Sequence, residues 1–254
     1  MDRRPIGFLD RGLGGVGVLK EALRQLPHES YLYYGDTAHI PYGDKSPEEI
    51  IELVHQAVDK LIALNCQAIV IACNTATSAA AGRLRQELHM PVIGMEPALK
   101  PASLLAGQGR ILVMATQATL SLPKFQALME RYGKDAVPVP CPGLMECVES
   151  GCLEGPVVED LLRKLLSPWL HLPVKAVVLG CTHYPFLRKT IASFFPPGVP
   201  LIDGNEGTIR QLKRRLDEEG LLGPDVGGGG VTFLSSSQDP AVPGRMKGML
   251  ELCP

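Results

Sequence analysis

The chain has 254 residues, of which 45% are hydrophobic and 20% charged, and its formal net charge is −2. This composition is typical of a globular protein with one large or two small domains. The charge gives no reason to expect nucleic acid or a membrane surface as a partner, and no apolar run reaches the ~20 residues of a membrane span. Because no signal-peptide core follows Met1, we expect a cytoplasmic protein whose seven cysteines are thiols.

Buried strand patterns alternate with helical patterns in the first part of the chain. The expected strands are 6–9, 31–34, the apolar run that ends at Cys73, and 91–94. The expected helices are 18–25, 46–64 and the stretch from just after Cys73 to 88, and Ser46-Pro47-Glu48-Glu49 is a capping box. This alternation predicts a parallel, doubly wound sheet, whose active site lies beyond the carboxyl ends of the strands.

The second part of the chain repeats this plan. Strands are expected at 111–114, 136–139, the run that ends at Cys181, 199–202 and 231–234. Helices are expected around Glu146 and Glu149, at 157–170, at 185–195, at 207–222 and near the end of the chain, with a flexible turn at 227–230. Cys181 lies 108 residues after Cys73, and a similar strand follows each cysteine. We therefore expect two related α/β halves, with the last strand packed on the first half.

A cysteine ends one buried strand in each half, in Ala72-Cys73-Asn74-Thr75 and in Gly180-Cys181-Thr182-His183. A thiol at a helix N-terminus has a lowered pKa, because the positive end of the helix dipole stabilises the thiolate. If the halves face each other, two thiols on opposite walls suit the removal of a proton from one face of a carbon and its return to the other. Asp10, Glu149 and His183 would set the protonation states of these thiols.

Polar side chains at the same strand ends are candidates for holding an anionic substrate together with backbone N–H groups at helix starts. They are Asn74, Thr75, Thr116, Thr119 and Thr182. A reaction of this kind needs neither a metal nor an organic cofactor.

Four motifs follow one another along the chain. They are Gly35-Asp36-Thr37 with Pro41-Tyr42-Gly43, Ala72-Cys73-Asn74-Thr75-Ala76, Cys141-Pro142 with Val148-Glu149, and Leu179-Gly180-Cys181-Thr182-His183-Tyr184-Pro185. As a set they resemble the glutamate racemases of the cofactor-independent Asp/Glu racemase family, enzymes of bacterial cell-wall synthesis. The resemblance implies two pseudo-symmetric, doubly wound parallel-sheet α/β domains that face a shared cleft. One would comprise residues 1–93 plus 207–254, and the other residues 94–206.

The resemblance also implies an isomerase that interconverts L- and D-glutamate by two-base proton transfer and supplies D-glutamate for peptidoglycan. Cys73 and Cys181 would transfer the protons, Asp10 would assist Cys73, and Glu149 and His183 would assist Cys181. The substrate contacts would be made by Asn74, Thr75, Thr116, Thr119, Thr182 and the loop of Pro41, Tyr42 and Gly43. The expected partner is small-molecule glutamate, with a homodimer as a further expectation and no cofactor or metal.

One position departs from the family pattern, since Arg11 stands where the family usually has serine, between Asp10 and Gly12. Three placements of its long cationic side chain are open. Arg11 could swing out to solvent, pair with a substrate carboxylate and thus join the substrate-binding residues, or fill the pocket. The last placement would favour a non-catalytic or nucleotide-binding protein.

Other readings of the sequence also remain open. Gly12 to Gly17 match G-x-G-x-x-G after a strand, and Asp36 ends the next strand, which is typical of a dinucleotide-binding oxidoreductase. That fingerprint accounts for neither cysteine motif, and it would place Asp10 near an anionic pyrophosphate. A zinc site formed by Cys73, Cys181 and His183 is a second alternative, and a racemase of aspartate or hydantoin a third. Glu146 competes with Glu149, and buried structural roles are expected for Cys66, Cys147, Cys152 and Cys253.

Overall fold

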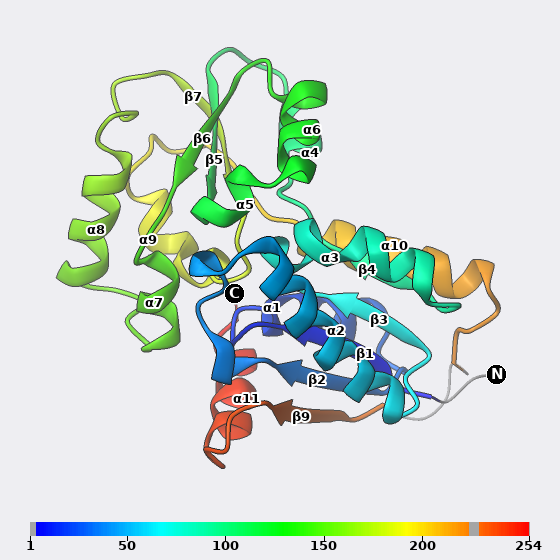
Figure 1. Ribbon diagram of the computed structural model, residues 1–254. Helices are drawn as coiled ribbons and strands as arrows, with labels where there is room; N and C mark the ends of the chain where they lie inside the picture. The colour runs from blue at the N-terminus through cyan, green and yellow to red at the C-terminus, as the bar shows by residue number, and fades with distance from the viewer. Residues whose placement is uncertain (1–3, 224–228, 254) are drawn as a thin grey trace. The chain divides into compact units, whose positions relative to one another are not determined.

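The computed structural model describes residues 4–223 and 229–253 (Figure 1). The chain divides into two compact units, one of Met1–Met95 with Asn205–Cys253 and the other of Glu96–Gly204. Each unit is built on its own parallel sheet. The prediction of two parallel-sheet α/β domains is therefore confirmed, whereas the start of the turn expected at 227–230 lies outside the described residues.

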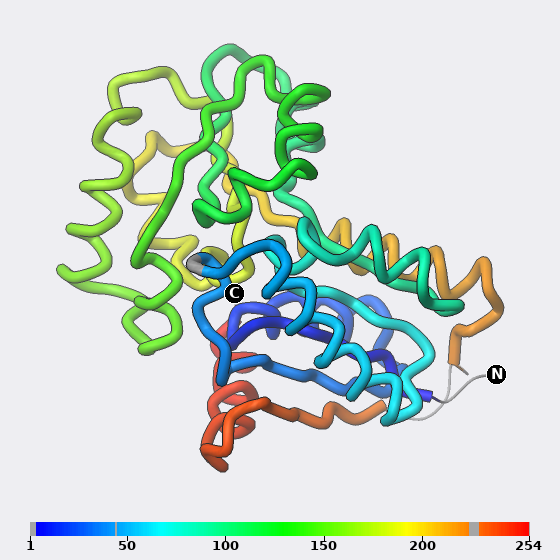
Figure 2. Tube along the Cα trace, viewed as in Figure 1, coloured from blue at the N-terminus to red at the C-terminus, as the bar shows by residue number. Residues whose placement is uncertain are grey.

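The first unit contains a five-stranded sheet with the order β4-β3-β1-β2-β9. Its strands are β1 (Ile6–Asp10), β2 (Tyr31–Gly35), β3 (Ala68–Ile71), β4 (Val92–Gly94) and β9 (Val231–Ser235). Every neighbouring pair is parallel, and Tyr31 of β2 is in register with Val231 of β9. The path of the chain in Figure 2 shows how the red C-terminal segment returns to lie beside the blue N-terminal strands. This return confirms that the tail completes the first half.

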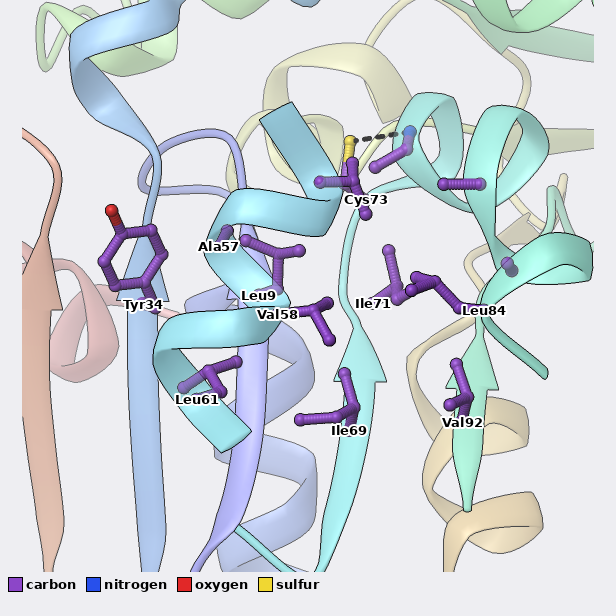
Figure 3. Close-up of a cluster of buried hydrophobic side chains, with 14 of the residues drawn as sticks. Leu9, Tyr34, Ala57, Val58, Leu61, Ile69, Ile71, Cys73, Leu84 and Val92 are labelled. Carbon is purple, nitrogen blue, oxygen red and sulfur yellow. Dashed lines mark hydrogen bonds between the residues drawn. The ribbon is translucent and has the colours of Figure 1, made fainter. Parts of the chain in front are cut away.

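Helices pack against the first sheet, and their apolar side chains form a buried core together with those of the strands. They are α1 (Val16–Gln25), η1 (Thr37–His39), η2 (Tyr42–Asp44), α2 (Pro47–Ala63), α3 (Asn74–Glu87), α10 (Asn205–Glu218) and α11 (Val242–Leu252). The Ser46 hydroxyl accepts the N–H of Glu49, and the Glu49 carboxylate accepts that of Ser46, so the expected capping box is present. Figure 3 shows apolar residues of α2, α3 and the sheet packed into one buried cluster, which fixes the end of β3.

The second unit contains a four-stranded sheet with the order β6-β5-β7-β8. Its strands are β5 (Arg110–Ala115), β6 (Ala136–Pro140), β7 (Val174–Leu179) and β8 (Leu201–Ile202), all parallel to their neighbours. When the strands of each unit are numbered from one in chain order, both sheets have the order 4-3-1-2, and the second sheet reads this order from β8 to β6. The first sheet has β9 as an additional strand. The repeat suggested by the cysteine motifs is thus a repeat of topology.

The helices of the second unit depart from the sequence expectations in several places. They are α4 (Leu99–Ser103), α5 (Gln117–Ser121), α6 (Pro123–Tyr132), α7 (Leu144–Glu149), α8 (Pro156–Leu166), η3 (Tyr184–Leu187) and α9 (Arg188–Ala192). The helix expected at 185–195 is a 3₁₀ turn followed by one short α-helix, and the helix expected at 157–170 ends at Leu166. The helices α4, α5 and α6 were not expected from the sequence.

The two matched strands place their cysteines alike. Cys73 lies two residues beyond the end of β3, and Cys181 lies two residues beyond the end of β7. Both cysteines are therefore at the carboxyl edge of a parallel sheet, where such folds bind ligands. Along the two described ranges of the chain, no helix combines the length and the apolar character needed to cross a membrane.

Candidate active site

The loop after β1 is wrapped around the side chain of Asp10. This carboxylate is fully buried, and its Oδ2 accepts the backbone N–H groups of Gly12 at 3.3 Å and Gly15 at 2.8 Å. The Tyr33 hydroxyl lies 3.5 Å from the same oxygen and donates to the carbonyl of Gly12 at 2.9 Å. A Cβ at position 15 would come within 2.6 Å of the Cβ of Asp10, so the close approach requires glycine. The loop therefore holds Asp10 in one position.

This loop geometry argues against the dinucleotide-binding alternative. The N–H groups of Gly12 and Gly15 point to the Asp10 carboxylate of the same chain, where a pyrophosphate would have to bind. The carboxylate of Asp36, the candidate ribose ligand, is hydrogen-bonded by the hydroxyl of Tyr42 at 2.7 Å. Both features of the fingerprint therefore serve contacts within the protein.

Cys73 is the N-cap residue of α3, and its sulfur accepts the backbone N–H of Ala76 at 3.4 Å (Figure 3). The thiol is only 2% exposed. Because α3 is 14 residues long, its N-terminal partial positive charge and this N–H both favour an ionised sulfur. Leu9 of β1 is in register with Ile71 of β3, so Asp10, the last residue of β1, and Cys73, which follows β3, lie at the same edge of the sheet.

The two residues after Cys73 begin α3 and are buried with it. Asn74 is 3% exposed and Thr75 is 1% exposed. Both the amide oxygen and the amide nitrogen of Asn74 have no hydrogen-bond partner among the described residues. A buried amide without partners costs about 1–3 kcal/mol, so Asn74 is suited to bind a polar ligand at this sheet edge.

The loop that carries Pro41, Tyr42 and Gly43 is held by Asp36. Besides the bond from Tyr42, Asp36 has its Oδ1 2.7 Å from Nδ1 of His39. Burial is the main cause that raises the pKa of Tyr42, followed by the charges of Asp36, Cys73 and Asp10. Tyr42 is therefore a permanent hydrogen-bond donor near Cys73 and Asp10. The sequence alone did not indicate that Asp36 holds Tyr42, although the two residues are only six positions apart.

In the second unit, three predicted residues form a connected chain of side chains. The sulfur of Cys181 lies 3.7 Å from Nδ1 of His183, and Nε2 of His183 lies 2.6 Å from Oε1 of Glu149. His183 is fully buried, which lowers its pKa, but the Cys181 and Glu149 partners outweigh burial and raise the pKa to about 10. The arrangement favours an imidazolium between two anions, a sulfur and a carboxylate.

The expectation of a helix dipole behind both thiols is wrong for Cys181. The residues after it form a turn and the 3₁₀ helix η3, whose first residue is Tyr184. A short 3₁₀ segment carries little dipole, so the charge next to Cys181 comes from His183 instead. The two sulfurs thus have different partners, a backbone N–H for Cys73 and an imidazole ring for Cys181.

The remaining predicted residues of the second unit lie at the same sheet edge. Thr116 is the N-cap of α5, where its hydroxyl accepts the N–H of Thr119 at 3.2 Å and lies 3.0 Å from the Thr119 hydroxyl. Thr182 Oγ1 lies 3.5 Å from Nδ1 of His183. Because Met114 of β5 is in register with Leu179 of β7, Thr116 and Cys181 follow adjacent strands.

The structure decides between Glu146 and Glu149, excludes one placement of Arg11 and gives the surroundings of Cys141. Glu149, and not Glu146, contacts His183. Arg11 is only 2% exposed, so the placement in which it swings out to solvent is wrong. Cys141 is buried and donates to the carbonyl of Val139 at 3.2 Å, and burial followed by the Cys181 charge raises its pKa to about 12, which makes it a poor nucleophile.

Each unit therefore brings part of the predicted site together. Asp10, Tyr42 and Cys73 are near one another in the first unit, and Glu149, Cys181 and His183 form a chain in the second. Among the described residues, no group of three or more His, Cys, Asp or Glu side chains is placed to hold a metal ion.

Comparison with known proteins identifies the family. Residues 16–212 match the family model of the Asp/Glu/hydantoin racemases. A glutamate racemase of Clostridium perfringens (strain 13 / Type A) is 47% identical over 251 residues, which are 98% of this chain and 96% of the relative. The alignment therefore covers nearly the full length of both proteins.

Two solved structures have the same fold over nearly the whole chain. Glutamate racemase from Thermus thermophilus in complex with β-chloro-D-alanine is 36% identical, with a TM-score of 0.84 over 99% of this chain and 94% of that one. Glutamate racemase from Francisella tularensis in complex with D-glutamate is 30% identical, with a TM-score of 0.85 over 99% and 95% of the two chains. The chain therefore belongs to the glutamate racemases of the Asp/Glu/hydantoin racemase family.

Proposed function

We propose that this protein interconverts L- and D-glutamate without a cofactor, and that Cys73 and Cys181 are the two proton-transfer residues. The observation that carries the proposal is that each unit ends an inner strand on a buried cysteine whose sulfur has an activating partner. The partner is the N-terminus of α3 for Cys73 and His183 for Cys181. The family to which the chain belongs and the D-glutamate in the Francisella structure support glutamate as the substrate.

In the proposed reaction, one cysteine is a thiolate and takes the α-proton of glutamate. The electron pair of the broken C–H bond stays on the α-carbon, which becomes a carbanion. The other cysteine is a thiol and returns a proton to the opposite face of that carbon. The first cysteine is then a thiol and the second a thiolate, so that the enzyme is ready for the reverse direction. The product is the other enantiomer, and no atom other than hydrogen is exchanged with the protein.

The residues around each sulfur have distinct roles in this proposal. Neutral His183 takes the proton of the Cys181 thiol and becomes an imidazolium, which Glu149 stabilises and which in turn stabilises the Cys181 thiolate. Asp10 is held at the edge next to Cys73 by its own loop, where its carboxylate would stabilise the ammonium group of the substrate or accept the proton of the Cys73 thiol. The two sides therefore differ, although both use a thiol.

Substrate recognition is proposed for the polar residues at the two sheet edges. They are Arg11, Pro41, Tyr42, Gly43, Asn74, Thr75, Thr116, Thr119 and Thr182. Asn74 offers an amide donor and an acceptor with no partner among the described residues. The side chain of Tyr42 is held in one position because its hydroxyl donates a hydrogen bond to Asp36.

Isotope exchange tests the proposal directly. The protein is incubated with L- or D-glutamate in deuterated water, and loss of optical rotation is followed together with exchange of the α-proton. We expect both enantiomers to racemise with incorporation of deuterium at the α-carbon, and L-aspartate to react far more slowly. The absence of exchange with either enantiomer of glutamate would overturn the proposal.

Single cysteine variants test the two assigned residues. Cys73→Ser and Cys181→Ser should each lower turnover by about 10²–10⁴-fold, because a serine hydroxyl is a much weaker acid than a thiol at neutral pH. Each variant should retain exchange of the α-proton of one enantiomer and lose that of the other, in opposite senses. Cys66→Ser is the matched control, because Cys66 is a buried cysteine that precedes β3 and lies away from the carboxyl ends of β3 and β7, and it should keep full exchange with both enantiomers. Equal loss of substrate binding in both active-site variants, with no difference between enantiomers, would contradict the assignment.

A further inference from the structure

The C-terminal end of α7 brings two cysteines together. The N–H of Cys152 donates to the carbonyl of Cys147 at 2.8 Å, and the N–H of Gly151 donates to the carbonyl of Val148 at 2.9 Å. Gly151 has a φ of +77°. These nested bonds and the left-handed glycine define a Schellman motif, in which the side chains of the first and last residues frequently face each other. The first and last residues here are Cys147 and Cys152.

Other observations support the proximity of these thiols. The charge of Cys152 contributes to the raised pKa of Cys147, for which burial is the larger cause. Both cysteines are free thiols. Cys147 is nearly buried, whereas Cys152 is partly exposed, so the expectation that both are buried structural cysteines is wrong for Cys152. The Cys152 thiol is thus accessible to a small reagent, whereas the Cys147 side chain is only 9% exposed.

We propose that Cys147 and Cys152 are a dithiol modification site, which a low-molecular-weight disulfide closes into an intramolecular disulfide that displaces Glu149 from His183. The Cys152 thiolate attacks one sulfur of the reagent and expels the other as a thiolate. The thiolate of Cys147 then attacks the sulfur of Cys152 and expels the second reagent thiolate. Two protein thiols are oxidised, one reagent disulfide is reduced to two thiols, and the two protons go to solvent or to the released thiolates.

Closure acts on the active site because Glu149 lies between the two cysteines on the same turn. A disulfide requires a sulfur–sulfur distance of about 2.05 Å, which is much shorter than a van der Waals contact, so the turn from Cys147 to Cys152 must tighten. The Glu149 carboxylate lies 2.6 Å from Nε2 of His183, and a hydrogen bond is lost when this distance grows by about 1 Å. The effect on catalysis rests on the proposed function, whereas the formation of the disulfide does not.

Peptide mapping tests whether the disulfide joins Cys147 and Cys152. The protein is treated with oxidised glutathione, alkylated under native and then denaturing conditions, and digested with a glutamate-specific protease. Cleavage after Glu146, Glu149 and Glu154 separates Cys147-Val148-Glu149 from the peptide of residues 150–154. We expect these two peptides to remain joined, with a mass two hydrogen atoms below the sum of the free thiol forms. A glutathione adduct on Cys152 without this link would overturn the proposal.

The effect of the disulfide on racemase activity is measured on the same samples. We expect the oxidised protein to lose about tenfold or more of its racemase turnover and to regain it with dithiothreitol, since a misplacement of about 1 Å at a catalytic site can cost about 10²-fold in rate. Cys152→Ser and Cys147→Ala keep basal activity within about twofold and should show no such reversible loss, which separates this effect from oxidation of Cys73 or Cys181. A joined peptide with unchanged turnover would contradict the coupling to Glu149.

One result separates this proposal from the proposed function. If the reduced protein shows no racemase activity at all, the function fails, and the digest still tests the disulfide. The displacement of Glu149 is then read from the pKa of His183 by NMR, which should fall on oxidation in the wild type and stay unchanged in Cys152→Ser. An unchanged His183 pKa in the oxidised wild type would contradict the displacement.

Discussion

Nε2 of His183 lies 2.6 Å from Oε1 of Glu149, although the two residues are 34 positions apart in the sequence. The helix α7 brings the carboxylate and the turn after β7 brings the imidazole. The fully buried ring is thereby connected to an anion on one side and to the sulfur of Cys181 on the other. This connection explains why a buried histidine can remain charged, and it makes the protonation of His183 a property that can be measured.

The first prediction concerns the pH dependence of stability. The pKa of His183 is raised to about 10 in the folded protein, above the ~6.5 of an unfolded histidine. A raised pKa means that the folded state binds the proton more tightly, so this contribution to stability is full below pH ~6.5 and is lost as the pH rises to 10. We expect Glu149→Gln to remove part of this contribution, at about 1.4 kcal/mol for each unit by which the pKa falls.

Urea unfolding of the wild type and of Glu149→Gln between pH 6 and 10 measures this contribution. The difference between the two proteins should be largest near pH 6–7 and should shrink toward pH 10. Glu146→Gln, one turn earlier on α7, is the matched control and should follow the wild type at every pH. A difference that grows with pH would contradict the assigned direction of the His183 shift.

The second prediction concerns the amide of Asn74. Because neither of its polar atoms has a partner among the described residues, replacing Asn74 by alanine removes no internal hydrogen bond. We expect Asn74→Ala to leave the Tm unchanged or slightly higher, and to raise KM for glutamate by about tenfold, since a lost hydrogen bond to a charged group costs about 1.5–3 kcal/mol. Thermal unfolding and initial-rate kinetics measure the two effects separately.

Thr77 offers a control on the same helix with the opposite expectation. Its hydroxyl donates to the carbonyl of Ile71 and accepts the N–H of Met95, each at 3.1 Å. Thr77→Val should therefore lower the Tm and leave KM nearly unchanged. If Asn74→Ala destabilised the protein as much as Thr77→Val does, a structural role would replace the binding role of Asn74.

The sequence predicted the sheets better than the contacts of the site. Strands buried on both faces give continuous apolar runs, such as the one that ends near Cys73, and a run of this kind can be recognised without knowledge of its neighbours. The capping box at Ser46 is likewise local, since all its atoms lie within four residues. The strand expected at 231–234 also appears, as β9, although its residues are only partly buried.

The features that the sequence did not predict depend on tertiary structure. The short helices α4 and α5 have five residues each and bury too few side chains to show a helical period. The choice between Glu146 and Glu149 depends on the rotation of α7 against the turn of His183, which residue spacing does not determine. The contact between Asp36 and Tyr42 closes a loop whose conformation has no sequence period.

The third prediction concerns the bond between Tyr42 and Asp36. The phenol donates to a carboxylate that is 2% exposed, so removing the hydroxyl leaves a buried charge with one hydrogen bond fewer. We expect Tyr42→Phe to lower the free energy of unfolding by about 1–3 kcal/mol. It should also raise KM, because the loop of Pro41 and Gly43 loses its fixed point. Urea unfolding and kinetics check these two results.

His39 provides the comparison for Tyr42, because it contacts the other oxygen of Asp36 with a side chain that is 43% exposed. An exposed ion pair contributes about 0–1 kcal/mol, so His39→Ala should be far milder than Tyr42→Phe. Equal effects of the two substitutions would mean that the carboxylate of Asp36, and not the buried bond to Tyr42, determines the loop conformation.

The last prediction concerns Arg11, which stands between Asp10 and Gly12 and is 2% exposed. A guanidinium stays charged when it is buried and forms paired bonds with carboxylates, of which glutamate has two. If Arg11 binds one of them, Arg11→Ser should raise KM by roughly tenfold or more, at about 1.5–3 kcal/mol for a bond to a charged group. Arg11→Lys should fall between the wild type and Arg11→Ser, and Arg24→Ser, an exposed arginine on α1, should leave KM unchanged. A lower KM in Arg11→Ser would instead mean that the arginine fills the pocket and that serine reopens it, and an unchanged KM would make Arg11 a structural residue of the β1 loop.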